Sequence, residues 1–71
     1  MIQPGIYQHY KGQHYQVLGT AQHTETSETL VVYQALYGDC LLWVRPLALF
    51  KQAVLQNDQE IPRFKFLSAT L

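Results

Sequence analysis

The chain has 71 residues, which is enough for one small domain and too few for two. Its composition, 48% hydrophobic and 14% charged, indicates a packed globule and excludes an intrinsically disordered segment. Five cationic side chains balance five carboxylates, so the basic excess that is typical of nucleic-acid-binding modules is absent. A net charge of zero also leaves little repulsion to oppose self-association.

The cysteine content and the hydropathy of the sequence indicate the cellular compartment in which we expect the protein. Cys40 is the sole cysteine, whereas a secreted domain of this size usually depends on several disulfides. The N-terminal stretch MIQPGIYQHYKG lacks the features of a signal peptide, and no apolar run approaches the roughly 20 residues of a membrane helix. We therefore expect a cytoplasmic protein that does not enter a membrane. We expect one domain over residues 1–71, with flexible ends at residues 1–4 and 68–71.

Short alternating runs rich in Tyr, Val and Phe are separated by turn residues, which is typical of a small antiparallel β protein. Between the fourth and fifth runs, a proline followed by apolar residues three apart predicts one helical or 3₁₀ turn within residues 46–51. Closing so few strands into one bent barrel hides their edges. The sequence therefore predicts an all-β fold, a small SH3-like barrel of five to six strands, near residues 5–10, 14–22, 29–37, 40–45, 52–56 and 60–67.

The turn residues predict the register of the first and last hairpins. Lys11-Gly12, taken as a two-residue loop, fixes the first register, and Asn57-Asp58 fixes the last, in which Val54 pairs with Ile61. In the first hairpin the predicted pairs are Ile6 with Val17 and His9 with His14. The side chains expected to face inward are Ile6, Tyr15 and Val17, and those expected to face outward are Tyr7, His9, His14 and Gln16.

A two-residue Gly38-Asp39 loop predicts the register of the central hairpin, pairing Gln34 with Trp43 and Tyr33 with Val44. Because side chains alternate along a strand, each face can be read from this register. The face predicted to join the core carries Val31, Tyr33, Ala35, Leu42 and Val44. The more exposed face carries Val32, Gln34, Leu36, Leu41, Trp43 and Arg45.

Three stretches, PGIYQHYKGQHYQVLGTAQHTET, LVVYQALYGDCLLWVRPLALF and IPRF, carry a resemblance to a known family. Over roughly residues 4–67 the chain resembles small bacterial proteins that are classified only as a domain of unknown function. The combination of HYKG, ALYGD, LWVRPL and PRF is the most specific part of this resemblance. It implies an SH3-type small barrel and brings no activity, cofactor or catalytic residue. Asn57-Asp58 departs from the glycine-containing turn that is usual there.

Candidate catalytic residues are few and scattered. Zinc sites usually need about three or four ligands, and nothing in the spacing forces the three histidines together with a carboxylate. The cysteine adjoins an aspartate in a turn, without the electropositive pocket of a catalytic thiol. We expect no enzymatic activity, no cofactor and no bound metal. The alternative from the enzyme class is a small metal- or thiol-dependent enzyme centred on His9, His23, Glu25 or Cys40.

Four side chains on the predicted outer face, Tyr7, His9, Trp43 and Arg45, are of the kinds that are enriched at recognition surfaces. We therefore expect a non-enzymatic binding or adaptor module that recognises a protein segment through these four residues. The alternative for Trp43 is a structural role, in which its ring completes a second small core and Arg45 stacks on it.

Two other kinds of partner stay open at this point. RNA or DNA could be contacted by cations and aromatic stacking, through Arg45, Arg63 and Lys65. A weak homodimer could form through an exposed strand edge or through the face that carries Leu36, Leu41 and Trp43.

Overall fold

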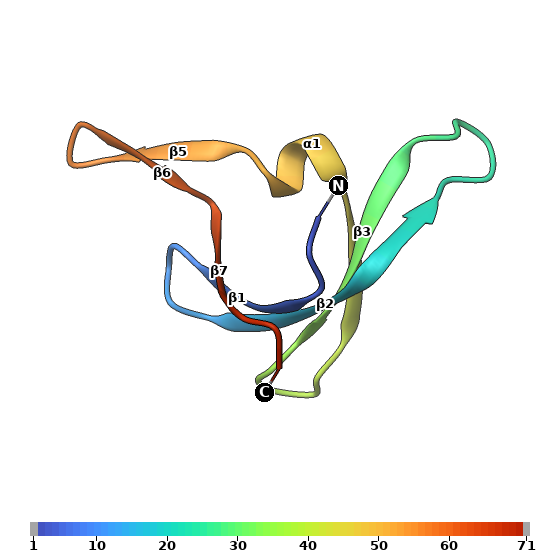
Figure 1. Ribbon diagram of the computed structural model, residues 1–71, viewed down its shortest axis with the longest axis horizontal. Helices are drawn as coiled ribbons and strands as arrows, with labels where there is room; N and C mark the ends of the chain where they lie inside the picture. Colours follow the sequence, from blue (N-terminus) through green and yellow to red (C-terminus); the bar gives the residue numbers. More distant parts are fainter. Residues whose placement is uncertain (1, 71) are drawn as a thin grey trace.

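The computed structural model describes residues 2–70, which form seven strands and one short helix (Figure 1). In chain order these are β1 (Gly5–His9), β2 (His14–Gln22), β3 (Thr29–Ala35), β4 (Leu42–Pro46), α1 (Leu47–Phe50), β5 (Ala53–Gln56), β6 (Gln59–Pro62) and β7 (Phe64–Ser68). The predicted all-β fold and the predicted helical turn are both confirmed. The last predicted strand is divided at Arg63 into β6 and β7. Met1 and Leu71, at the outer ends of the segments predicted to be flexible, lie outside the described residues.

Five strands form one antiparallel sheet in the order β4-β3-β2-β1-β7, and β5 and β6 form a separate hairpin. The sheet curls into a barrel-like shape, with α1 at one end (Figure 1). The β5–β6 hairpin projects to one side of the barrel, and we call residues 53–62 the arm (Figure 1). No helix within the described residues is long and apolar enough to span a membrane.

The core is an aromatic cluster inside the curled sheet. Its buried members are Tyr7, Val17, Val31, Tyr33, Phe50 and Phe64. The rings of Phe50 and Phe64 stack with their centroids 4.1 Å apart, and Tyr33 meets Phe50 edge to face at 5.3 Å. The strands supply β-branched and aromatic residues at every second position, and α1 supplies Phe50, which fills the space that the sheet alone leaves open.

The first hairpin is one residue away from its predicted register. Tyr7 pairs with Tyr15, because the loop holds three residues rather than two. The Gly12 N–H donates to the His9 carbonyl at 2.7 Å, and Gly12 has a φ of 110°, a conformation that glycine adopts readily. This shift places Tyr7 inside the barrel with an exposed fraction of 7%, so the prediction that Tyr7 faces outward is wrong.

The central hairpin differs from its prediction in the same way. Tyr33 pairs with Trp43 and not with Val44. The Cys40 N–H donates to the Tyr37 carbonyl at 3.0 Å, and Cys40 itself has a φ of 54°, which adds one left-handed residue to the loop. Trp43 and Arg45 therefore share the inner face with Tyr33. Of the five residues predicted for the core, those on β3 are buried, whereas the two on β4 are exposed, Leu42 at 62% and Val44 at 59%.

The register predicted for the last hairpin is confirmed, since Val54 pairs with Ile61. Asn57 and Asp58 have φ values of 53° and 62°, as the two central residues of a type I′ turn require. The sequence signal was sufficient here because the loop contains only these two residues.

Candidate functional site

Two adjoining hollows lie along β7. The first has a volume of about 330 Å³ and is lined by Ile2, Gln3, Tyr7, Phe50, Lys51, Pro62, Phe64, Lys65 and Phe66. The second has a volume of about 430 Å³ and is lined by Gln8, His9, Tyr10, Ile61, Pro62 and Lys65. Because they share Pro62 and Lys65, we treat them as one site and call it the β7 groove.

Pairing between β1 and β7 builds the floor of the groove. Phe66 pairs with Tyr7 and Phe64 pairs with His9, so ring meets ring along both strands. The Tyr7 and Phe66 rings pack edge to face at 5.3 Å. The Tyr7 hydroxyl donates to the Gln3 carbonyl at 2.6 Å, which fixes the segment before β1 at the edge of the groove. Burial raises the pKa of Tyr7, although this hydrogen bond lowers it in part.

Charge is distributed unevenly around the groove. Lys51 and Lys65 are the two residues with full charges that line it, and none of the five carboxylates does. The carboxylates lie in the β2–β3 loop, in the β3–β4 turn and on the arm, as Glu25, Glu28, Asp39, Asp58 and Glu60. The groove therefore has a positive potential, although the net charge of the chain is zero.

His9 ends β1 in the second hollow. Its Nδ1 accepts the Lys11 N–H at 3.1 Å, and its ring packs edge to face on Phe64 at 5.0 Å and tilted on Tyr10 at 4.6 Å. Desolvation lowers the pKa of His9, and the nearby charges of Arg63, Lys11 and Arg45 lower it further. His9 is therefore neutral at pH 7, and this end of the groove has an aromatic surface with cations around it.

Arg63 connects the base of the arm to the first hairpin. Its carbonyl accepts the Tyr10 N–H at 2.9 Å, and its own N–H donates to the Gln52 carbonyl at 3.0 Å. One guanidinium nitrogen donates to the Gln52 side-chain oxygen at 3.4 Å, whereas the buried Nε–H has no acceptor. A buried donor without a partner is uncommon, and it adds to the positive potential beside His9.

The structure separates the four predicted site residues into two pairs. Tyr7 and His9 line the β7 groove, whereas Trp43 and Arg45 lie on β4. The guanidinium of Arg45 lies over the Phe64 ring, 5.8 Å from its centroid. Trp43 is 47% exposed and lies outside the core cluster. The four residues therefore do not form the single outer face that the sequence predicted.

Trp43 borders a third and smaller hollow of about 80 Å³, together with Leu41 and Tyr37. The Tyr37 hydroxyl lies 2.8 Å from the Tyr15 hydroxyl. Burial and this hydrogen bond raise the pKa of Tyr15 to about 12, so the Tyr15 hydroxyl is neutral in the physiological range. This hollow is too small for more than one short side chain of a ligand.

The three residues of the nucleic-acid alternative also occupy different places. Lys65 lines the groove, Arg63 lies at the base of the arm, and Arg45 lies over the core ring Phe64. Arg45 and Arg63 both lie close enough to His9 to lower its pKa, so two of the three cations share His9 as an aromatic neighbour.

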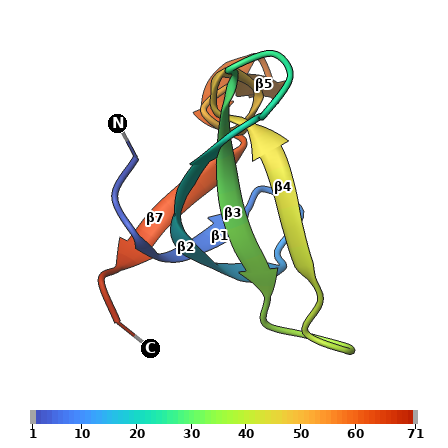
Figure 2. The ribbon, with the colours of Figure 1, turned by 90° about the vertical axis from the view of Figure 1, so that its right-hand side faces the viewer.

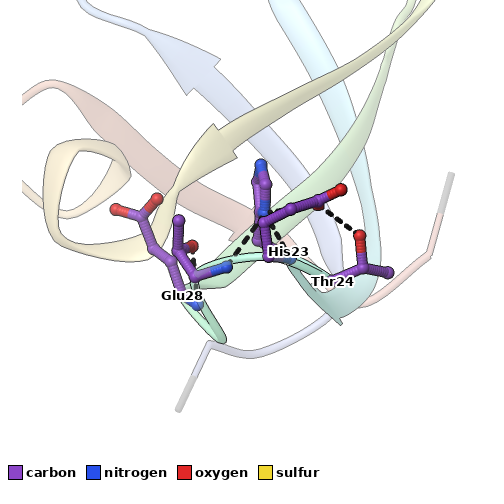
Figure 3. Close-up of polar contacts among 5 residues, drawn as sticks. His23, Thr24 and Glu28 are labelled. Carbon is purple, nitrogen blue, oxygen red and sulfur yellow. Dashed lines mark hydrogen bonds and ion pairs between the residues drawn. The ribbon is translucent and has the colours of Figure 1, made fainter.

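His23 and Glu25 form a histidine–carboxylate pair in the loop between β2 and β3 (Figure 3). His23 Nδ1 lies 3.4 Å from Glu25 Oε2, and it accepts the backbone N–H groups of Glu25 and Thr26 at 3.1 and 3.4 Å. The side chain of Thr24 donates to the same Glu25 carboxylate. No group of three or more potential metal ligands occurs within residues 2–70. The hydrogen bonds of His23 account for its position in this loop.

Several groove residues were not identified as site residues from the sequence. The alternation in PRFKFL does predict that Phe64 faces inward, and the spacing of the helical turn singles out Phe50. Lys51 and Pro62 carry no sequence signal for a site, because they meet β7 only after α1 and the arm take their positions in the fold.

The comparisons with known proteins agree with this fold. The crystal structure of a DUF1653 protein from Bordetella bronchiseptica superposes with a TM-score of 0.85 at 38% sequence identity, covering 93% of this chain and 87% of that chain. No curated protein matches the sequence. The family model described as "Protein of unknown function (DUF1653)" matches residues 5–66. The chain therefore belongs to the DUF1653 family.

Proposed function

We propose that this protein is a non-enzymatic binding module that holds an extended segment of a partner protein in the β7 groove. The observation that carries this proposal is the lining of the groove. Aromatic and apolar side chains form its floor and walls, and its full charges are Lys51 and Lys65 alone. Apolar contacts would provide most of the affinity, and the two cations would select for carboxylates.

The dimensions of the groove suit a peptide. The two hollows, of about 330 and 430 Å³, lie at the lower end of the range for ligand pockets, so each can take one or two side chains. Phe64 and Phe66 face one side of β7, whereas Lys65, which pairs with Gln8, faces the other. A segment that occupies both hollows must therefore be extended and cross the edge of β7, with apolar side chains on Phe64, Phe66 and Pro62. Acidic side chains of the segment would then reach Lys51 and Lys65.

The same lining argues against catalysis in the groove. His9 is the one histidine that lines it, and the lining residues given above include no carboxylate, cysteine or serine. A histidine usually acts in catalysis together with one of these groups. The described part of the chain thus offers His9 no partner of this kind in the groove.

An NMR titration of the labelled protein tests the proposal. We expect a peptide with alternating apolar and acidic residues to shift the amide signals of β7, of His9 and Tyr10, and of Ile61 on the arm. Lys65→Glu should weaken this peptide about tenfold or more, because it replaces an attraction by a repulsion. A peptide with lysines in place of its acidic residues is the matched control, and it should bind the variant better than the native protein. Shifts confined to the β2–β3 loop, or no saturable shifts, would refute the proposal.

A second candidate function is the binding of single-stranded RNA. It is favoured by the gathering of Lys11, Arg45 and Arg63 around His9, beside the aromatic surface of Tyr10. A phosphate-dominated complex weakens steeply as salt rises, whereas a mainly apolar peptide complex does not. Titration with a short RNA at two salt concentrations therefore distinguishes the two candidates.

A further inference from the structure

The edge of the barrel sheet at β4 is free. β4 is the outermost strand in the order β4-β3-β2-β1-β7, and among residues 2–70 no strand pairs with its outer side (Figure 2). Natural proteins usually protect such an edge with charged residues, because unpaired backbone groups invite another strand. β7, the opposite edge strand, carries Lys65 in this way. From Cys40 to Val44 the chain has no charge at all.

The hydrogen bonds of β3 show which groups of β4 are available. The Ala35 N–H donates to the Leu41 carbonyl at 3.0 Å. In an antiparallel pair the bonding residues alternate, so residues 41, 43 and 45 bond to β3. The N–H and C=O groups of Leu42 and Val44 point away from β3, toward the free edge. Pro46 also falls at an outward position, so it can accept but not donate a hydrogen bond at this edge, and the available donors there are the N–H groups of Leu42 and Val44.

The side chains of β4 are complementary to the same strand run in reverse. We propose that β4 pairs antiparallel with β4 of a second copy of this chain, across a two-fold axis at Val44. Val44 then faces its own symmetry mate, and Leu42 faces Pro46 of the second copy on the outer face. On the inner face Trp43 meets Arg45 of the second copy, a favourable contact between an aromatic ring and a cation, and it occurs twice.

The net charge of the chain and the exposure of the β4 side chains support a second copy of this chain as the partner of β4. The chain has no net charge, so two copies approach without repulsion. Arg45 forms no ion pair in the part of the chain that the structure describes, which leaves its charge available to Trp43 of the other copy. Leu42, Trp43 and Val44 are each between 47% and 62% exposed in the single chain, and all three would be covered in the pair. The β7 groove takes no part in this contact. The proposal of peptide binding in the groove and the proposal of pairing through β4 can therefore be tested separately.

Sedimentation of the full chain over a range of concentrations tests the pairing. We expect a reversible monomer–dimer equilibrium. Val44→Lys places two like charges opposite each other at the axis and should raise the dissociation constant about tenfold or more. Leu55→Lys is the matched control, because it adds the same charge to an exposed leucine on the arm, and it should leave the equilibrium unchanged. A monomer at about 1 mM, or equal effects of the two variants, would overturn the proposal.

Amide hydrogen exchange of the native protein gives a second test that does not depend on any variant. The amides of Leu42 and Val44 should exchange slowly at high concentration and rapidly after dilution. The Trp43 amide bonds to β3 within one chain and should stay slow in both conditions. Concentration-dependent protection at β7 in place of β4, or at neither strand, would overturn the proposal.

Discussion

The strands of the barrel have five to nine residues and those of the arm have four, and the two parts are stabilised in different ways. Each inner strand of the barrel pairs on both sides, and its inward side chains join one aromatic core. The strands of the arm pair only with each other, and Leu55 is 79% exposed. An isolated two-stranded hairpin is at best marginally stable. The difference indicates a rigid frame on one side of the β7 groove and a more adaptable wall, formed by Ile61 and Pro62, on the other.

The largest expected effect is in the core. Phe50→Ala removes the ring that stacks on Phe64 and should lower the free energy of unfolding by about 3–5 kcal/mol. Leu55→Ala on the arm should change it by less than about 0.5 kcal/mol. Urea unfolding of both variants measures the contrast. Similar losses would show that the arm shares the stability of the barrel.

Trp43→Ala should have an intermediate effect, about 1–2 kcal/mol, because the ring is about half exposed and lies outside the core cluster. The measurement is again urea unfolding, carried out at a concentration low enough to keep the chain monomeric. A loss as large as that of Phe50→Ala would establish Trp43 as a core residue. A loss of unfolding free energy near zero would show that the Trp43 ring does not stabilise the single chain, which leaves contacts with a partner as its role.

A smaller effect is expected in the arm. Asp58 has a φ of 62°, which glycine adopts at lower cost, so Asp58→Gly should stabilise the β5–β6 turn by about 0.4–1 kcal/mol. Amide exchange of the arm should slow, whereas amides of the core strands should not change. A parallel change in both regions would mean that arm and barrel unfold as one unit.

The smallest effect concerns pH, because His9 is only half-buried and solvent screens part of the effect of the nearby charges. The pKa of His9 is lowered in the folded state, so the unfolded chain binds the proton more tightly. The contribution of His9 is therefore fully present above pH 6.5, and stability decreases as the pH falls from 6.5 toward the folded-state pKa. NMR titration should find a His9 pKa below 6.5, and Arg63→Gln should raise it. A value at or above 6.5 would contradict the position of His9 among cations.

Much of the fold could be predicted from the sequence, because strand alternation and turn residues are local signals. The helical turn, the Asn57-Asp58 hairpin and the strand-forming segments were correct, except that the last segment forms two strands, β6 and β7. The registers of the first and the central hairpin were wrong, since Gly12 and Cys40 each add a left-handed residue to the loop. A cysteine in this conformation has no recognisable sequence signature.

The error in register carried over to the candidate site. A shift of one residue moved Tyr7 from the outer face to the floor of the groove, and moved Trp43 and Arg45 to the inner side of the sheet. His9 was selected as a candidate for an outer face that the structure does not contain, and it lines the β7 groove instead. The groove depends on contacts between β7, the arm and α1, which are distant in sequence, so no local pattern could predict it.

The pairing of β1 with β7 joins residue 6 to residue 68, nearly the two ends of the sequence. Such a contact must overcome the loop entropy of almost the whole chain, and sheets closed in this way fold slowly, on a scale of about milliseconds to seconds. During synthesis β1 can pair with β2 on one side, but its other side has no partner strand until β7 leaves the ribosome. The closing strand of the barrel is thus also the one that completes the β7 groove, so the groove forms only when folding is complete.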